Sequence, residues 1–289
     1  MPGSAIRRAV STARSVRAVI ARPPYATPGH FYSPLTAESD ISRALTWVQA
    51  PGVDLAQERQ LALAARLQPQ LAEPTPGPRY VASNAMFGPA DAAVYRAMLT
   101  HLRPARVLEV GSGFSTAVAL DEADANPALA GLEITCIEPY PERLLGLIQA
   151  SDYAASDRGR LTLVRQPVQD VDPAVFGRLG AGDVLFVDST HVVKAGSDVV
   201  WLFLHVLPRL AAGVVVHVHD VFWPFEYPAP WLRQRRDWTE AYLLHAFLAG
   251  NTSWEILLFS SWLWRCQPEL IPQHLAGEQP GSLWIRKVS

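Results

Sequence analysis

Two short polar runs carry the side chains best suited to chemistry. They are Asp188-Ser189-Thr190-His191 and His217-Val218-His219-Asp220, and each belongs to or directly follows an apolar run. In an open α/β sheet, ligands bind outside the carboxyl ends of the strands, so we expect both runs at the reaction site. Three ligand-type side chains, those of Asp188, His219 and Asp220, would then converge from neighbouring strands.

A glycine-rich turn lies earlier in the chain, in Glu109-Val110-Gly111-Ser112-Gly113-Phe114-Ser115-Thr116. Glycine has no side chain to obstruct the backbone, so the N–H groups of such a turn can approach a polar or anionic ligand. In the dinucleotide fingerprint a third glycine permits close packing of helix on strand, but here Thr116 takes that place. The turn therefore points away from NAD.

A second acid, Glu138, ends the next predicted strand. A carboxylate at that place can accept hydrogen bonds from both hydroxyl groups of a ribose. It would serve S-adenosylmethionine (SAM) and NAD equally. These residues alone therefore leave the identity of the nucleotide-like ligand open.

Short apolar runs alternate with helical stretches in the rest of the chain. We predict strands over residues 106–110, 133–138, 161–165, 184–188, 213–219, 254–259 and 283–286. We predict helices from Asp54 to about Leu67, from Pro89 to about Leu102, and from Asp198 to Leu210, the last one capped by Ser197 or Asp198. The alternation is typical of βαβ units and predicts an α/β fold, a doubly wound, mostly parallel seven-stranded sheet with an N-terminal helical extension.

The domain organisation follows from these elements. We predict an N-terminal arm and helical extension or lid over residues 1–83, and the ligand-binding domain over residues 84–289. An aromatic-rich insertion at about residues 222–250 would cover the reaction site and favour a planar or amphipathic substrate. A homodimer interface or plain core packing would explain its aromatic residues equally well.

Bulk composition restricts the class of partner. With 289 residues, 49% of them hydrophobic, and a formal net charge of −2, the chain can bury a sizeable core but has no field that would gather nucleic acid. No apolar stretch reaches the ~20 residues of a membrane span. Cys136 and Cys266 fit reduced thiols better than a disulfide, so we expect a cytoplasmic protein that acts on a small molecule.

The first 37 residues contain five arginines and no acid. A transit peptide or a membrane-surface helix would have this charge, but the segment lacks the apolar core and cleavage site of a secretory signal. We expect a solvated N-terminal arm.

From about Asn84 onward, the sequence resembles the class I SAM-dependent methyltransferases, specifically small-molecule, metal-assisted enzymes such as catechol O-methyltransferase. The glycine turn and Ile137-Glu138-Pro139 carry this resemblance. It implies a Rossmann-like methyltransferase fold in which the turn holds the methionine part of SAM and Glu138 holds the ribose. The cofactor-binding residues it implies are Glu109, Gly111, Gly113, Ser115, Glu138, Phe87 and, near the adenine, Gln169 or Asp170.

The resemblance also implies a divalent metal ion at Asp188, His219 and Asp220, which would lower the pKa of a substrate oxygen before it attacks the SAM methyl. The family more often has a carboxylate where this chain has His219. A nitrogen ligand there would move the preference from Mg towards Mn, Fe or Zn.

A general base is implied at the same place. Where the family often carries a lysine, this chain has His191, whose unperturbed pKa near ~6.5 suits the role. Lys194 follows as an orienting group or an alternative base. The predicted catalytic residues are therefore His191, Asp188, Lys194 and His219.

Structural roles compete with several of these assignments. Glu109 could simply cap the glycine turn, and His191 could hold Asp188 by a hydrogen bond. His217 lies two residues deeper than His219 and is expected in the core. The segment Asn84-Ala85-Met86-Phe87-Gly88 would close over the cofactor or act as a hydrophobic staple for the next helix.

The predicted function is methyl transfer from SAM to an oxygen, less favourably N or C, of a small-molecule acceptor, as in natural-product biosynthesis. Three alternatives stay open: metal-free methyl transfer, a metal-dependent oxygenase or hydroxylase on the same scaffold, and a non-catalytic SAM-binding module. The intact glycine turn speaks against the non-catalytic module. Glu138 speaks against the oxygenase.

Overall fold

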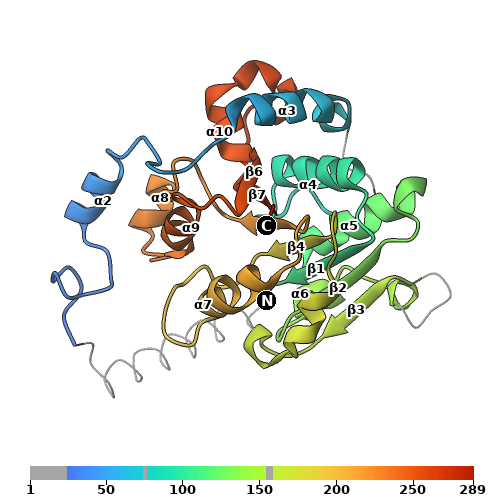
Figure 1. The fold of residues 1–289 in the computed structure, drawn as a ribbon, viewed down its shortest axis with the longest axis horizontal. Helices are drawn as coiled ribbons and strands as arrows, with labels where there is room; N and C mark the ends of the chain where they lie inside the picture. Colours follow the sequence, from blue (N-terminus) through green and yellow to red (C-terminus); the bar gives the residue numbers. More distant parts are fainter. Residues whose placement is uncertain (1–24, 74–76, 154–158) are drawn as a thin grey trace, which may run out of the picture. The chain divides into compact units, whose positions relative to one another are not determined.

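The computed structural model describes residues 25–73, 77–153 and 159–289 (Figure 1). Its sheet has seven strands in the order β3-β2-β1-β4-β5-β7-β6. β7 pairs antiparallel with β5 and β6, and the remaining pairs are parallel. The doubly wound, mostly parallel sheet predicted from the sequence is confirmed. The strands are β1 (Arg106–Val110), β2 (Glu133–Ile137), β3 (Leu161–Val164), β4 (Val184–Val187), β5 (Val215–His219), β6 (Trp254–Phe259) and β7 (Ser282–Lys287).

Helices precede, connect and follow these strands. The α-helices of the described residues are α2 (Glu38–Ala44), α3 (Gln57–Ala72), α4 (Pro89–Leu102), α5 (Phe114–Ala125), α6 (Glu142–Leu145), α7 (Asp198–Trp201), α8 (Ala229–Arg233), α9 (Glu240–Leu248) and α10 (Ser260–Cys266). None of the helices in the described part of the chain has both the length and the apolar character needed to cross a bilayer.

The crossovers that contain α5 and α7 run in opposite directions from the middle of the sheet. The first leads from β1 outward to β2, and the second leads from β4 outward to β5. Right-handed crossovers of opposite direction place their helices on opposite faces of the sheet. The point of divergence lies between β1 and β4, and the carboxyl ends of these two strands therefore flank the crevice where such sheets bind ligands.

The centre of the sheet is buried. Every residue of β4 and of β5 is buried, as the near-continuous apolar character of inner parallel strands requires. Tyr95 of α4 packs against Phe186 and Trp284, with ring centroids 4.8 and 6.0 Å apart. This packing covers β4, which leads into the first polar run, and β7, which pairs with β5.

α3 is longer than the sequence predicted. It begins at Gln57 rather than near Asp54 and continues past Leu67 to Ala72, with Pro69 inside it. Leu63, Leu67 and Leu71 are buried, and α3 packs on α4 and β6, as Figure 1 shows for α3 and α4. The free energy gained by burying the last turn exceeds the cost of the hydrogen bond that Pro69 cannot donate.

The helix predicted from Asp198 to Leu210 is regular only in its first turn. Ser197 caps it as predicted, since its Oγ accepts a hydrogen bond of 3.2 Å from the Val200 N–H. A π-helical turn then covers Leu202–Val206, and a 3₁₀ turn covers Leu207–Arg209. Pro208 explains why the regular α-helix does not continue to Leu210. It has no N–H to donate, and its ring displaces the preceding turn.

Two compact units divide the chain. The larger one, residues 48–227 and 238–289, contains the whole sheet and also α3, which the sequence placed in the N-terminal extension. The smaller unit includes the described residues 25–47 and 228–237, where the Thr36 N–H donates to Asp237 Oδ1 over 3.1 Å. The first 24 residues, most of the basic arm, lie outside the described residues. The boundary at residues 83 and 84 and the lid role stay predictions.

Candidate active site

The glycine turn leaves the end of β1 in a conformation that suits glycine. Gly111 has φ +89°, and a Cβ atom on it would lie 1.9 Å from the carbonyl oxygen of Asp188. Only glycine therefore lets the turn pass so close to the end of β4. Gly113 ends the turn with φ +154°, and α5 begins at the next residue.

Glu109 lies beneath this turn and is completely buried. Its carboxylate accepts hydrogen bonds from the Thr116 hydroxyl, from Tyr95 OH over 3.3 Å and from the Cys136 thiol over 3.4 Å. Burial raises the pKa of Glu109 to about 7, although these hydrogen bonds oppose the shift. The Thr116 hydroxyl also accepts a hydrogen bond from the Gly113 N–H, so the residue in place of a third glycine ties the acid to the turn.

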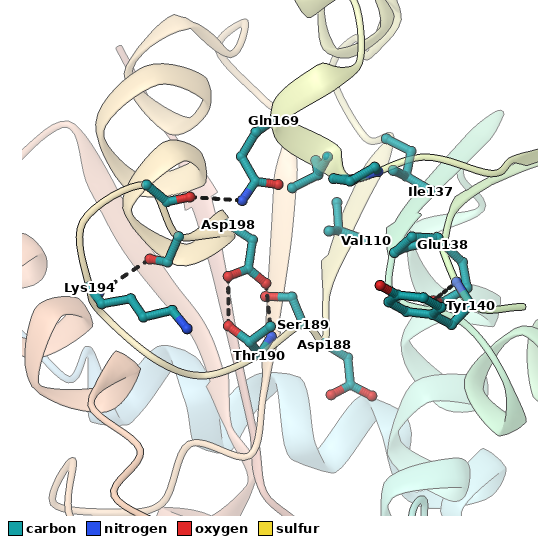
Figure 2. A pocket seen from close by; sticks show the side chains of 16 residues that line it. Val110, Ile137, Glu138, Tyr140, Gln169, Asp188, Ser189, Thr190, Lys194 and Asp198 are labelled. Carbon is teal, nitrogen blue, oxygen red and sulfur yellow. Dashed lines mark hydrogen bonds between the residues drawn. The ribbon is translucent and has the colours of Figure 1, made fainter. Parts of the chain in front are cut away.

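A cavity of about 390 Å³ opens between the turn and the ends of β2 and β4. Figure 2 shows Glu138 and Tyr140 on one side of it, and Asp198 and Lys194 on the other. Glu138 is held by two backbone N–H groups, those of Tyr140 at 2.8 Å and Ser112 at 3.2 Å. Each carboxylate oxygen keeps a further lone pair that can accept a ribose hydroxyl.

The opposite wall is held together by its own hydrogen bonds. Asp198 accepts from the backbone N–H and the hydroxyl of Thr190 at 2.9 and 2.6 Å. Gln169, whose side chain lines the cavity, donates to the Gly196 carbonyl over 3.0 Å (Figure 2). The Ser189 hydroxyl is buried at the cavity and has no hydrogen-bond partner among the described residues.

These features fit SAM. The volume lies within the range of small-molecule sites, the glycine turn gives backbone access, and Glu138 offers the acceptors that a ribose needs. The unpartnered Ser189 hydroxyl offers a further polar contact to a ligand.

Several predicted cofactor residues do not line the cavity. Gly111, Glu138 and Gln169 do, as does the catalytic candidate Asp188. Phe87 is instead only 2% exposed and packs at the carboxyl end of β5, with its ring centroid 5.0 Å from that of His219. The residues outside the lining are Glu109, Gly113, Ser115, Asp170 and Phe87.

The second polar centre gathers at the tips of β4 and β5. His191 Nε2 lies 3.3 Å from Asp188 Oδ1 and 3.7 Å from Asp220 Oδ2. The ligand atoms of these three residues all lie within 4.8 Å of one another, a spacing that can hold a metal ion. The structure therefore groups His191 with the two aspartates, while His219 lies outside this group and contacts Asp220 at 3.7 Å.

Backbone geometry at the two tips explains this arrangement. His191 has φ +59° and Asp220 has φ +55°, a left-handed conformation that L side chains rarely adopt. Such residues persist where surrounding contacts over-determine them, and they concentrate at functional sites. The left-handed turns bring His191 back towards the carboxylates.

His219 and His217 lie behind this centre. His219 is 2% exposed, and its Nε2 lies 3.7 Å from Asp220 Oδ1. His217 is buried, stacks on Phe186 at 3.9 Å, and has no hydrogen-bond partner among the described residues for either ring nitrogen. Burial lowers the pKa of His217 well below its usual value, which agrees with the neutral core residue that the sequence suggested.

Carboxylate and imidazole groups in this cluster favour each other's charged forms. Burial opposes ionisation of Asp188, but the charge of His219 and the hydrogen bond from His191 lower its pKa to about 2. Burial likewise opposes the charged form of His191, yet its bonds to Asp188 and Glu240 raise its pKa well above the usual value. Two carboxylates at this place therefore require a positive partner, which a proton on an imidazole or a metal ion can supply.

Three contributing residues were given no role of their own by the sequence, although Glu240 belongs to the insertion that was expected to cover the site. Glu240 hydrogen-bonds His191 Nδ1 over 2.8 Å, although the two residues are 49 positions apart. Asp91 of α4 accepts from the Gly281 N–H, and burial together with the nearby aspartates raises its pKa to about 6 even though His219 opposes the shift. Tyr140 lines the cavity two residues after Glu138, which was a usable signal. Glu240 and Asp91 look in the sequence like ordinary acids in a first helical turn.

Known proteins match this chain in three comparisons. A family model described as a methyltransferase domain matches residues 108–221. An uncharacterised protein of Archaeoglobus fulgidus is 36% identical over 174 residues, which is 53% of this chain and 72% of that protein.

Solved structures are similar at low identity. A methyltransferase of Podospora anserina bound to SAH is 16% identical, over 92% of this chain and 100% of that one, with a TM-score of 0.45. An O-methyltransferase of Bacillus cereus in complex with SAH is 11% identical, over 87% and 92% of the two chains, with a TM-score of 0.45.

The region matched by the methyltransferase-domain model contains the glycine turn, Glu138 and both polar runs. The strand order and the cavity at the switch point agree with this match. Residues 108–221 therefore form a methyltransferase domain, and the cavity at its switch point fits SAM as the methyl donor.

Proposed function

We propose that this enzyme transfers the SAM methyl group to an oxygen atom of a small-molecule acceptor, with a divalent metal ion held by Asp188, His191 and Asp220. One observation carries the proposal: Asp188 belongs to both sites. Its side chain lines the cavity that fits SAM, and its Oδ1 lies 3.3 Å from His191 Nε2. An acceptor bound at the cluster would therefore adjoin the cofactor.

The donor set suggests which ion would bind. Two carboxylates and one imidazole offer ligand atoms within 4.8 Å of one another. A nitrogen ligand favours Mn, Fe or Zn over Mg, whose preferred ligands are oxygen atoms. In this proposal His191 takes the ligand position that the sequence assigned to His219.

Each side chain then has a defined task. SAM supplies an electrophilic methyl group, and the ion supplies Lewis-acid activation of the acceptor oxygen. Glu138 would hold the ribose of the cofactor, and Asp188, His191 and Asp220 would hold the ion beside it. Lys194 lines the same cavity, and we assign it the orienting or proton-accepting role. His219, 3.7 Å from Asp220, supports that carboxylate from behind.

Metal-free methyl transfer is the second candidate, and one contact favours it. Glu240 and His191 form a buried carboxylate–imidazole pair at 2.8 Å, the arrangement of an acid–base dyad. In that case His191 would act on the acceptor hydroxyl directly.

Two experiments separate the metal-assisted from the metal-free mechanism. Calorimetry measures the binding of SAM and of S-adenosylhomocysteine (SAH), each with and without EDTA. Turnover is measured as SAH release over a panel of hydroxylated aromatic acceptors. We expect SAM binding that survives EDTA and turnover that EDTA abolishes and Mn²⁺ restores. Turnover unaffected by EDTA would favour the metal-free mechanism. Absence of SAM and SAH binding would sink both.

A further inference from the structure

The N-terminal end of α9 clamps the loop that follows β4. The carbonyl oxygen of His191 accepts hydrogen bonds from the Thr239 N–H at 2.9 Å and the Glu240 N–H at 3.1 Å. The Val193 N–H donates to the Thr239 hydroxyl over 2.7 Å. The imidazole ring packs on Trp238 with centroids 4.3 Å apart. Three consecutive residues therefore hold His191 by its backbone and by one ring face.

Glu240 holds the edge of the His191 imidazole by a hydrogen bond. Its side chain is completely buried, and Oε2 lies 2.8 Å from His191 Nδ1. An ionised carboxylate can only accept a hydrogen bond, so Nδ1 carries the hydrogen in this pair. Nε2 is then the nitrogen that faces Asp188 and Asp220, at 3.3 and 3.7 Å.

The clamp also explains the backbone of His191. Its φ of +59° is unfavourable for a residue with a Cβ atom, and the contacts with Thr239 and Glu240 fix the carbonyl group that follows. Orientation of the ring thus depends on α9, which contributes no atom to the proposed ligand set.

We propose that Glu240 is a positioning residue of the reaction centre, which holds His191 with the Nε2 lone pair directed at an ion shared with Asp188 and Asp220. The inference rests on the proposed function, because it gives Nε2 the role of a metal ligand. Carboxylates that accept from the distal N–H of a ligating histidine fix its tautomer, and their loss typically weakens metal binding 10- to 100-fold. Glu240 therefore sets the affinity and the selectivity of a site that it does not touch.

The test measures Mn²⁺ and Mg²⁺ binding by calorimetry on the SAM-loaded full chain. The variants are Glu240→Ala and Glu240→Gln, with Glu226→Gln as the matched control. Glu226 is also a buried acid of the insertion, but it accepts from Tyr242 OH at 2.7 Å and from the Tyr227 N–H at 2.8 Å. Thermal melts and SAM affinity show whether each variant is folded.

We expect Glu240→Ala to bind Mn²⁺ about 10- to 100-fold more weakly and to lose part of the preference for Mn²⁺ over Mg²⁺. Glu240→Gln should fall between, because its amide oxygen can still accept from Nδ1–H. Glu226→Gln should bind both ions like the parent chain, and SAM affinity should stay within a few-fold in all three variants.

A second readout does not depend on metal. The ¹⁵N-coupled Nδ1 proton of His191, assigned by its loss in His191→Gln, should be present in the metal-free parent chain and in Glu226→Gln but absent from Glu240→Ala. A parent chain that binds neither ion would overturn the proposed metal site and leave this proton as the test of Glu240. A Glu240→Ala chain that keeps both the proton signal and the parent Mn²⁺ affinity would overturn the inference.

Discussion

The two sides of the crevice are built in different ways. On the cofactor side, the contacts join residues close in sequence: Thr116 and Glu109 are seven positions apart, and Ser112 and Glu138 are 26 apart. On the reaction side, His191 depends on Glu240, 49 positions away, and on Asp220 from the next strand. These cofactor-side hydrogen bonds thus stay within residues 109–138, whereas the reaction centre needs the segments after β4 and β5 and the start of α9 to be in place.

Electrostatics differ in the same way. Glu109 is surrounded by neutral donors, and burial raises its pKa to about 7. Asp188 is also removed from water, but it faces the charge of His219 and the hydrogen bond from His191, which lower its pKa to about 2. The pKa values of these two acids, one in β1 and one directly after the adjacent β4, are therefore shifted in opposite directions. The acid of the reaction side stays charged, as binding a cation requires.

The largest effect should come from the residue that the two sides share. We expect Asp188→Ala to lower turnover about 1,000-fold or more, because it removes a ligand to the activating charge. The SAM dissociation constant should stay within a few-fold, since Glu138 and the glycine turn are untouched. Steady-state SAH release and calorimetry measure the two quantities. Equal loss of both would show that the reaction centre lies elsewhere.

A change on the cofactor side should give the opposite pattern. Glu138→Ala removes the acceptors expected to bind the ribose hydroxyls, and charge-assisted hydrogen bonds of this kind support a loss of about 100-fold in SAM affinity. Mn²⁺ binding to the Asp188, His191 and Asp220 cluster should be unchanged in the same protein. A Glu138→Ala chain that binds SAM as tightly as the parent contradicts the assignment of Glu138.

The smallest effect on SAM binding should come from Glu109→Gln, but this change should alter the dependence of stability on pH. Because the pKa of Glu109 rises from 4.5 to about 7 on folding, the folded state holds its proton more tightly. Stability should therefore fall as pH rises from about 4.5 to 7, by up to about 3 kcal/mol. Thermal melts from pH 5 to pH 8 should show this fall in the parent chain and a smaller one in Glu109→Gln. Parallel slopes for the two chains would show that Glu109 is ionised when folded.

The same contrast explains how far the sequence could predict the molecule. β1 and β6 begin and end where the apolar runs predicted. β1 lies inside the sheet and is buried beyond its first residue, whereas β6 is the edge strand and its burial alternates, but both read as short apolar runs. The glycine turn and Glu138 were also visible, since each lies at the end of such a run. Local patterns were sufficient for the cofactor side.

The reaction side could be predicted only in part. Asp188 and Asp220 follow their strands, but the exchange of His219 for His191 depends on left-handed backbone at His191 and Asp220, and no residue type there required it. Glu240 is one acid among many in the sequence, and only the approach of α9 to the loop after β4 gives it a role. Long-range packing, which a single sequence does not display, decides such contacts.

The position of β7 has a consequence for biosynthesis. Ser282–Lys287 pairs with β5 on one side and β6 on the other, with Ser282 opposite His219. As the chain leaves the ribosome, β5 has an open edge and β6 has no partner strand until β7 is made, and open edges invite pairing with other chains. The Gly281 N–H that holds Asp91 arrives with the same strand. The glycine turn and Glu138 can thus be in place before residues 281–287 are made, whereas the Asp91 contact beside the reaction centre needs those residues.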